Sequence, residues 1–337
     1  MRLIQRSASS FLWLYFLLSV SAQALVVPLS RRDAVLAAAT TAGTSSSSSL
    51  LIGASPPTSQ PTSVLLEDKY EFPLVSFGLQ IYDDATAYKL TMTALEVGYR
   101  NFFASVLARN QKGFARAVRD SGIPRDQLFI CGSVVSNRAR GYDAARIATT
   151  QGWQANMNAF AAAGNIDYLD QIMLDYPGPD VASIRGQWKA FEDMRNEQLV
   201  RTLSVSNFDG PQLDAILLDP AQQHTYRPVV NQLPYSVAYH PSVLRANQQR
   251  NILVQAWAPL GGSLGGRFNA RIRQACADIG ATKKGTKSAY QVALRWVLQQ
   301  GVAVCTQTTK REHFVEDLNI FDFTLTADEM KTLEQLA

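Results

Sequence analysis

Side chains that commonly carry catalysis or bind metals are few in this chain and do not cluster. Three cysteines and three histidines lie far apart in the sequence: Cys131, Cys276 and Cys305, and His224, His240 and His313. An odd, unclustered set of cysteines indicates neither a disulfide framework nor a zinc site. No histidine has a serine or aspartate partner at the spacing of a hydrolytic triad, and we find no metal-binding motif. The spacing therefore favours neither metal chemistry nor nucleophilic catalysis.

The composition is that of a globular protein without a nucleic-acid-binding surface. The chain has 337 residues, of which 47% are hydrophobic and 18% charged. This mixture excludes a collagen-like, coiled-coil or wholly disordered chain. The formal charge is +4, and residues 1–54 hold +3 of it. The rest of the chain is nearly neutral, so no nucleic-acid partner is expected.

Residues 1–24 have the pattern of a secretory signal peptide. Arg2 and Arg6 precede the apolar run 11–18, and small residues follow at 21–24. A basic start, a short apolar run and small residues before a cleavage point are typical of such signals. The run is shorter than the roughly 20 residues that span a bilayer. We therefore expect no transmembrane segment in the mature chain.

Residues 25–70 are expected to hold a second targeting segment and a disordered linker. Arg31 and Arg32 precede the mildly apolar stretch 34–41, which resembles a twin-arginine signal. A signal peptide followed by such a segment resembles the layered presequences of algal proteins bound for the plastid and its thylakoid lumen. The alternative is one signal peptide, a serine-rich spacer and an extracellular protein. The mature chain is expected to start after residue 24, or near residue 55 if the second signal is used.

From about residue 72 onward, short apolar runs alternate with segments of helical periodicity. Each apolar run is a few residues long, which is typical of a strand buried on both faces. The runs cover residues 74–79, 101–106, 128–132, 171–174, 200–204, 229–231, 252–257 and 302–306. The helical segments cover residues 85–97, 112–121, 143–164, 183–197, 210–217 and 288–298. Asp84 is the expected N-cap of the first helix.

Eight strand–helix repeats across residues 71–337 predict an α/β fold of the (β/α)8 TIM-barrel type. The Gly-rich piece 261–266 is expected to be a loop over the barrel mouth. A doubly wound sheet is the weaker alternative, because no GxGxxG motif follows the first strand.

Six motifs in order resemble the aldo-keto reductase superfamily over roughly residues 72–337. They are Ala94-Leu95-Glu96-Val97-Gly98-Tyr99-Arg100, Asp167-Tyr168-Leu169-Asp170, Val205-Ser206-Asn207-Phe208, Val230-Asn231-Gln232, Ala256-Trp257-Ala258-Pro259-Leu260-Gly261 and Ala293-Leu294-Arg295-Trp296. Each motif alone is weak, but six in register imply the barrel fold of that family. Fold alone does not deliver function.

The four catalytic groups of that family are absent at the matching positions. In the family a tyrosine gives a proton to the carbonyl oxygen, a lysine lowers the pKa of that tyrosine, an aspartate pairs the lysine and a histidine orients the carbonyl. The resemblance places these four at Ala108, Ser133, Phe103 and Asp175, respectively. Loss of the general acid alone is expected to cost about 10²–10⁴-fold in rate. An ionised Asp175 would oppose a developing alkoxide, unless burial keeps it protonated.

The resemblance implies a bound NADP or NAD, held weakly, and no metal. At the nicotinamide end the family's carboxamide ligands correspond to Ser206, Asn207 and Gln232, and its stacking aromatic to Trp257. The backbone at Pro259, Leu260 and Gly261 matches the segment that meets the pyrophosphate.

At the adenosine end the match is poorer. The family's lysine–serine pair corresponds to Gln307 and Thr308, its arginine to His313, and its adenine-binding pair to Glu316 and Asp317. An amide and an imidazole replace two cations that pair a 2′-phosphate, so discrimination in favour of NADP is expected to be weak.

Two functions follow from this pattern. The first is a catalytically inactive binding or structural subunit with a nucleotide or an unknown protein as its partner, and it predicts no measurable carbonyl reduction. The alternative is an active NAD(P)H-dependent carbonyl or quinone reductase with a relocated proton donor. The hydroxyl groups expected to approach the mouth are those of Ser133, Tyr176, Tyr235 and Tyr239. Loss of all four catalytic groups favours the first function.

Overall fold

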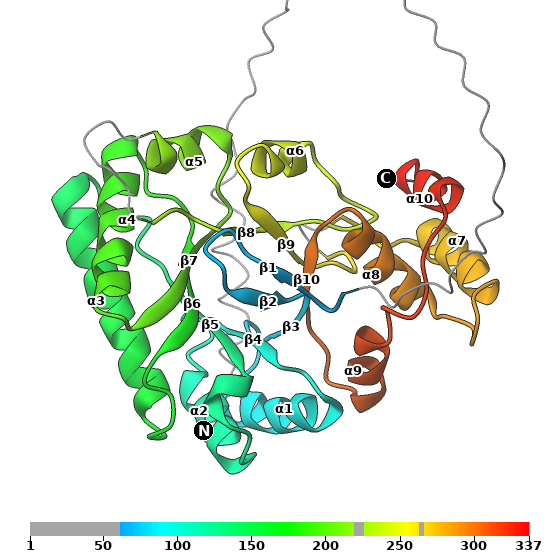
Figure 1. Ribbon diagram of the computed structural model, residues 1–337, viewed down its shortest axis with the longest axis horizontal. Coiled ribbons are helices and arrows are strands. Elements are labelled where there is room, and N and C mark those ends of the chain that lie inside the picture. Colours follow the sequence, from blue (N-terminus) through cyan, green and yellow to red (C-terminus); the bar gives the residue numbers. More distant parts are fainter. Residues whose placement is uncertain (1–60, 219–225, 263–265, 337) are drawn as a thin grey trace, which may run out of the picture. The chain divides into compact units, whose positions relative to one another are not determined.

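The protein is a closed barrel of eight parallel strands surrounded by helices (Figure 1). The computed structural model describes residues 61–218, 226–262 and 266–336. The strand order around the barrel is β10-β3-β4-β5-β6-β7-β8-β9. The strands are β3 (Val75–Gly78), β4 (Asn101–Ala104), β5 (Phe129–Val134), β6 (Leu169–Asp175), β7 (Val200–Ser206), β8 (Val230–Pro234), β9 (Leu253–Trp257) and β10 (Ala303–Thr306). The eight predicted strands and the (β/α)8 fold are confirmed.

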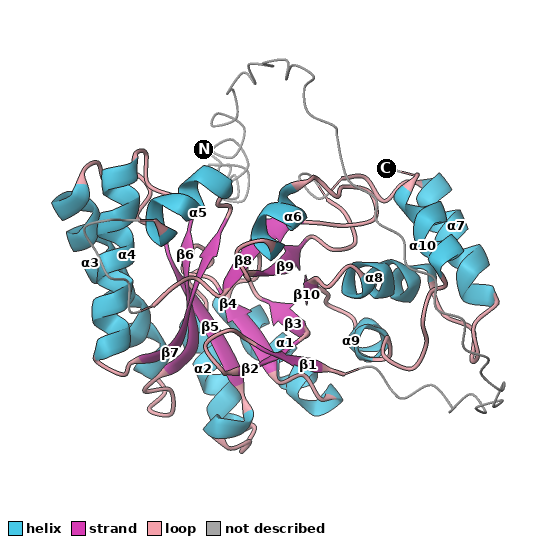
Figure 2. Ribbon diagram, turned by 45° about the horizontal axis from the view of Figure 1, so that its top comes forward, coloured by secondary structure: helices cyan, strands magenta, loops and turns pink. Residues whose placement is uncertain are grey.

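Helices lie on the outside of the strands, as Figure 2 shows. They are α1 (Asp84–Val97), α2 (Gln111–Asp120), α3 (Tyr142–Ala161), α4 (Val181–Asn196), α5 (Gly210–Leu217), α6 (Val243–Gln248), α7 (Ala270–Ala281), α8 (Ala289–Gln299), α9 (Arg311–Leu318) and α10 (Ala327–Glu334). The six predicted helices are confirmed with small shifts at their ends. Helices α6, α7, α9 and α10 were not predicted, because they are short or largely polar and their periodicity is weak.

The first helix begins one residue earlier than its predicted cap implied. Asp83, not Asp84, is the N-cap of α1, and its carboxylate accepts the amide hydrogen of Thr86 at 2.7 Å. The Asp84 carboxylate instead accepts from the Gly113 amide at 2.6 Å and pairs with Arg116 at 2.9 Å. A Cβ at Gly113 would collide with the Asp84 carbonyl oxygen, so a glycine is required where α1 and α2 meet.

An antiparallel hairpin precedes the barrel. Strands β1 (Ser63–Leu65) and β2 (Glu71–Pro73) pair with each other, so ordered structure begins before residue 71, the expected start of the barrel domain. Buried Leu66 and Phe72 pack with Phe129, Val230 and other residues at the beginnings of the barrel strands. The two strands of three residues are too short to give a recognisable apolar pattern.

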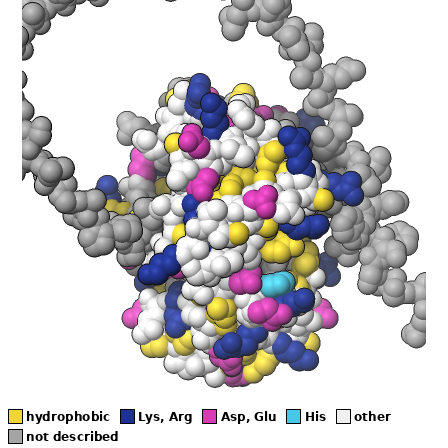
Figure 3. All heavy atoms as spheres, turned by 90° about the vertical axis from the view of Figure 1, so that its right-hand side faces the viewer, with side chains coloured by type: hydrophobic (Ala, Val, Ile, Leu, Met, Phe, Trp, Pro, Cys, Tyr) yellow, Lys and Arg dark blue, Asp and Glu magenta, His cyan; other side chains and the backbone are white. Residues whose placement is uncertain are grey.

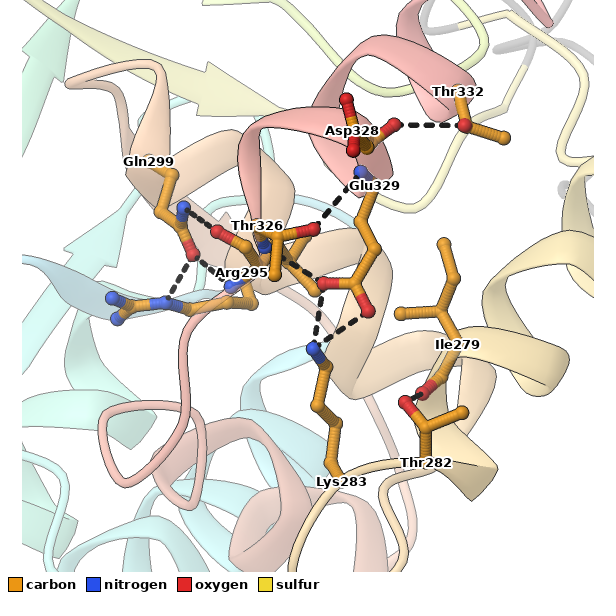
Figure 4. A network of polar contacts seen from close by, with 10 residues as sticks. Ile279, Thr282, Lys283, Arg295, Gln299, Thr326, Asp328, Glu329 and Thr332 are labelled. Carbon is orange, nitrogen blue, oxygen red and sulfur yellow. Dashed lines mark hydrogen bonds and ion pairs between the residues drawn. The ribbon is translucent and has the colours of Figure 1, made fainter.

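The C-terminal helix is fixed by polar contacts, shown in Figure 4. Lys283, just after α7, pairs with Glu329 of α10 at 2.6 Å. Glu329 also forms a capping box with Thr326, and the Trp296 indole donates to the Met330 carbonyl at 3.1 Å. These contacts tie α10 to α7 and α8.

The charge on the surface, the membrane-spanning potential of the helices and the N-terminal segments were each subjects of a prediction from the sequence. On the face that carries α7 to α10, Lys and Arg side chains are interspersed with Asp and Glu (Figure 3). In the described part of the chain, none of the helices has the length and apolar character needed to cross a membrane. The predicted signal peptide (1–24) and most of the second targeting segment and linker (25–70) lie outside the described residues.

Candidate functional site

The predicted catalytic positions gather at the carboxyl ends of neighbouring strands. Phe103 is on β4, Ser133 on β5 and Asp175 is the last residue of β6, while Ala108 lies in the turn after β4. Loops at this end of a (β/α)8 barrel carry the active sites of such proteins. Phe103 and Ser133 are fully buried, and Asp175 is 8% exposed.

Apolar and sulfur-bearing side chains fill the barrel interior beneath these positions. Phe103 packs with Cys131, Met173 and Cys305, all buried. Burial raises the pKa of Cys305 to about 11 and raises the pKa of Cys131 well above its ordinary value. Both thiols are therefore protonated at neutral pH and serve as packing groups rather than nucleophiles.

The predicted substitute proton donors are poorly suited to that role. The buried Ser133 hydroxyl oxygen accepts the amide hydrogen of Val106 at 3.3 Å. Burial raises the pKa of Tyr176 and of Tyr235 to about 12. The Tyr235 ring is also stacked on Trp296, with centroids 5.9 Å apart. A phenol with a raised pKa releases its proton less readily than a free one.

Asp175 differs from these hydroxyl groups because its pKa lies close to neutral pH. Burial raises its pKa to about 6, against a partial opposing effect of hydrogen bonds from Ser206 and Asn207. Asn207 Nδ2 donates to Asp175 Oδ1 at 3.2 Å. Among the described residues, no cation contacts this carboxyl, so only neutral dipoles stabilise its charged form.

The predicted carboxamide-binding residues lie together with Asp175. Asn207 has a left-handed backbone, with φ of 64°, and its Nδ2 also donates to Ser206 Oγ at 3.0 Å. The Trp257 indole donates to Asn207 Oδ1 at 3.3 Å. A hydrogen-bonded chain thus runs from Asp175 through Asn207 to Trp257. Gln232 is turned inward and donates to Gln255 at 2.8 Å.

The segment after β9 forms a tight turn beside Trp257. Ala258 has φ of 52°, and the Gly261 amide donates to the Ala258 carbonyl at 2.9 Å. This turn holds Pro259 and Leu260. Gly261 has φ of 83°, and a Cβ there would lie 2.7 Å from the Gly266 carbonyl oxygen. The close approach requires glycine, and it presents main chain rather than side chains at this edge.

At the expected adenosine end, the residues that replace the two cations already have partners. Gln307 Nε2 donates to Gln80 Oε1 at 2.7 Å. His313 Nδ1 and Thr308 Oγ1 share a hydrogen bond of 3.1 Å. Sequence reasoning overlooked the nearby Lys310 and Arg311, which are exposed and form no ion pair in the described part of the chain. The run Thr-Thr-Lys-Arg was the available signal.

The two residues expected at adenine differ in environment. Glu316 accepts from the Ser288 hydroxyl at 3.1 Å and is partly exposed. Asp317 is buried and accepts from the Tyr99 hydroxyl at 3.2 Å. Burial raises the pKa of Asp317 to about 6. Both residues present oxygen acceptors of the kind that an exocyclic amine donates to.

The donor set fits a nicotinamide carboxamide at one end, and at the other an amide and an imidazole stand at the two positions where the family has cations for a 2′-phosphate. Ser206, Asn207 and Trp257 converge on one edge and offer both donors and acceptors. Gln307 and His313 offer no fixed positive charge. Clusters of three or more metal-binding side chains are absent from the described residues.

Comparisons with known proteins show which family the chain is similar to. The family model described as Aldo/keto reductase family matches residues 74–337. The chain is 28% identical to the 9,11-endoperoxide prostaglandin H2 reductase of Trypanosoma cruzi, covering 81% of this chain and 90% of that protein. It is also 28% identical to the glyoxal reductase of Bacillus subtilis, covering 83% and 94%.

A solved structure gives the same result. The aldo/keto reductase from Brucella melitensis superposes with a TM-score of 0.70 at 25% identity, covering 83% of this chain and all of that chain. The residues matched by the family model, 74–337, include all eight barrel strands. The chain therefore belongs to the aldo/keto reductase family.

Proposed function

We propose that this protein is an NAD(P)H-dependent oxidoreductase that reduces a carbonyl group without the family's tyrosine. The observation that carries the proposal is the hydrogen-bonded chain Asp175–Asn207–Trp257 at the carboxyl ends of the strands. It joins an acid to the residues suited to hold a nicotinamide. The relatives named above are reductases, which favours activity over the inactive subunit expected from the sequence.

The chain's own residues have defined tasks in this proposal. Ser206 and Asn207 hold the carboxamide through hydroxyl and amide groups, and Trp257 supplies an aromatic face for the ring. The glycine-dependent turn at 259–261 offers main-chain groups to the pyrophosphate. A bound dihydronicotinamide would supply the hydride. Buried Phe103, Cys131 and Met173 exclude water from beneath this site.

A second function, nucleotide binding without turnover, is supported by a different observation. Phe103 fills the position of a carboxylate, and Ser133, at the position of a lysine, is fully buried with its hydroxyl already bonded to the Val106 amide. The family's charged pair cannot be rebuilt by a small movement here. A protein that senses or stores the nucleotide would have this arrangement.

One experiment with two readouts separates these functions. The first readout is quenching of tryptophan fluorescence on titration with NADH and NADPH, with Trp257→Phe as the control that removes the indole beside Asn207. The second is oxidation of either nucleotide with a panel of aldehydes, ketones and quinones. Binding with turnover supports the reductase. Binding without turnover on the whole panel supports the second function, and absence of binding contradicts both.

A further inference from the structure

We propose that Asp175 is the catalytic acid, whose carboxyl proton goes to the substrate's carbonyl oxygen. This inference rests on the proposed reductase function and names the group that replaces the phenol. Neither the family match nor the names of the relatives assign this role to an aspartate.

The position of the carboxyl is the first argument. Asp175 ends β6 and shares a strand face with Met173, which is part of the cluster inside the barrel. The residue is 8% exposed, so it is largely shielded from solvent at the end of the strand. Asn207 contacts both Asp175 and Trp257. A carbonyl placed over a ring at Trp257 is therefore close to this acid.

The surroundings of the carboxyl are the second argument. The titratable groups that face it are Cys131 on β5 and the adjoining Tyr176, and both have a raised pKa, so both are neutral at pH 7. Ser206 and Asn207, at the end of β7, contribute dipoles without charge. Because no cation in the described part of the chain faces Asp175, its pKa of about 6 leaves a protonated fraction under mildly acidic and neutral conditions.

The proton balance is complete with this acid. A bound dihydronicotinamide would supply the hydride for the new C–H bond, and the electron pair of the carbonyl π bond would move to oxygen. That oxygen takes the proton from the Asp175 O–H, which gives the alcohol and a carboxylate. The Asn207 Nδ2 donor at 3.2 Å stabilises the carboxylate that forms. Water then returns a proton to Asp175.

Competing donors at this end of the barrel are less suitable. Tyr176 and Tyr235 hold their protons with a pKa of about 12. The Ser133 hydroxyl is fully buried. Tyr239 is 40% exposed, and no cation contacts its ring or its hydroxyl within the described ranges. An acid with a pKa near the working pH transfers a proton more readily than any of these.

The test uses four purified full-length proteins: wild type, Asp175→Asn, Asp175→Glu and the control Asp214→Asn. The control removes a carboxylate of α5 from the partly exposed pair with Arg250, which is not part of the hydrogen-bonded chain Asp175–Asn207–Trp257. Each protein is assayed for nucleotide oxidation from pH 4.5 to 8.5 with the most active carbonyl substrate. Nucleotide affinity by fluorescence titration and the unfolding midpoint are measured in parallel.

The expected wild-type turnover falls about tenfold per pH unit above pH 6, while nucleotide affinity stays constant. Asp175→Asn is expected to lower turnover about 100-fold or more at pH 6 with nucleotide affinity changed less than threefold. Asp175→Glu keeps part of the turnover and the same pH dependence. Asp214→Asn matches wild type.

Two results would overturn the inference, and they can be told apart. If wild type turns over and Asp175→Asn keeps the same rate and pH profile, the acid is another group while the reductase function stands. If wild type binds the nucleotide without turnover at any pH, both the inference and the reductase function fail. Intact nucleotide binding and folding of Asp175→Asn separate loss of the acid from loss of the site.

Discussion

The two ends of strand β6 carry two buried aspartates with opposite surroundings. Asp170, at the beginning of the strand, pairs with Arg125 at 2.7 Å and Arg201 at 3.0 Å, and both guanidinium groups stack on Tyr168. Asp175, at the carboxyl end, has only neutral hydrogen-bond partners. Both side chains are nearly inaccessible. The same residue type is thus paired with cations at one end, while at the other end burial without a cationic partner among the described residues raises its pKa to about 6.

This difference separates stability from chemistry within one strand. A buried carboxylate with two arginine partners fixes local geometry, and removal of one partner leaves uncompensated charge. A buried carboxyl without a cation costs stability when it ionises, but it can release and regain a proton near neutral pH. In barrels of this type, carboxylates paired with arginines are expected at the amino-terminal ends of the strands, which contribute to stability. Unpaired carboxyl groups are expected at the carboxyl ends, where the active sites lie.

The largest effect on the free energy of unfolding is expected from removing the ion pairs of Asp170 with Arg125 and Arg201. Asp170→Asn leaves Arg125 and Arg201 without a counter-charge, although its amide oxygen can still accept the Ile130 amide hydrogen. We expect a loss of about 3 kcal/mol in the free energy of unfolding, because Arg201 remains partly solvated. Urea unfolding followed by circular dichroism measures it. A loss below about 1 kcal/mol would show that the Asp170 ion pairs contribute no more than exposed ion pairs do.

At the unpaired end the corresponding change is expected to stabilise the protein. The pKa of Asp175 is about 6 in the folded protein, above the ordinary value of 3.8, so the folded state binds the proton more tightly. Its contribution is complete below pH 4 and is lost as the pH rises through 6. Asp175→Asn is therefore expected to gain about 3 kcal/mol over wild type at pH 8 and nothing at pH 4. Unfolding of both proteins at the two pH values tests the sign.

The two ends of the expected nucleotide groove allow a second comparison. Wild type is expected to bind NADP with no large preference over NAD, because Gln307 and His313 carry no fixed charge. Gln307→Lys and His313→Arg are each expected to raise NADP affinity about tenfold while NAD affinity stays unchanged, as a charge-assisted bond to the 2′-phosphate adds about 1.5 kcal/mol. Calorimetric titration with both nucleotides measures the ratio. Strong NADP selectivity in wild type would refute the assignment of these positions.

The smallest effect is expected at a surface pair that resembles the Asp170 pair in chemistry. Asp214 binds Arg250 through two hydrogen bonds of 2.8 and 2.6 Å, but both side chains are partly exposed. Asp214→Asn is expected to lose less than about 1 kcal/mol in the free energy of unfolding, and less still in high salt. Urea unfolding followed by circular dichroism measures this loss as well. A loss equal to that of Asp170→Asn would contradict the explanation that burial makes the Asp170 ion pairs stronger than the Asp214 pair.

The barrel could be predicted from the sequence because its strands are short apolar runs buried on both faces. The sequence predicted residues 171–174 as a strand, and the structure extends it to β6, whose seven residues are all buried although two of them are aspartates. The hairpin β1–β2 and helix α9 escaped prediction, since strands of three residues and a largely polar helix leave little periodic signal. The choice of Asp83 over Asp84 as a cap depends on the position of α2, which is a tertiary contact.

The candidate site could be located in the sequence but not understood from it. Alignment of motifs placed Phe103, Ser133 and Asp175 at the ends of adjacent strands. The raised pKa of Asp175 depends on its burial without a cationic partner among the described residues. The inward orientation of the Gln232 side chain depends on its hydrogen bond to Gln255 of the next strand. Both follow from three-dimensional packing. The targeting signals and the compartment predicted for the N-terminus stay predictions.

The most direct test is the titration of the Asp175 carboxyl itself. Carbon-13 NMR of protein labelled at the aspartate carboxyl carbons, with the Asp175→Asn variant to assign the signal, gives the midpoint in the absence of nucleotide and substrate. We expect a midpoint close to 6, well separated from the exposed aspartates. A midpoint near the ordinary value of 3.8 would mean that Asp175 is ionised at working pH, and it would contradict its role as the acid.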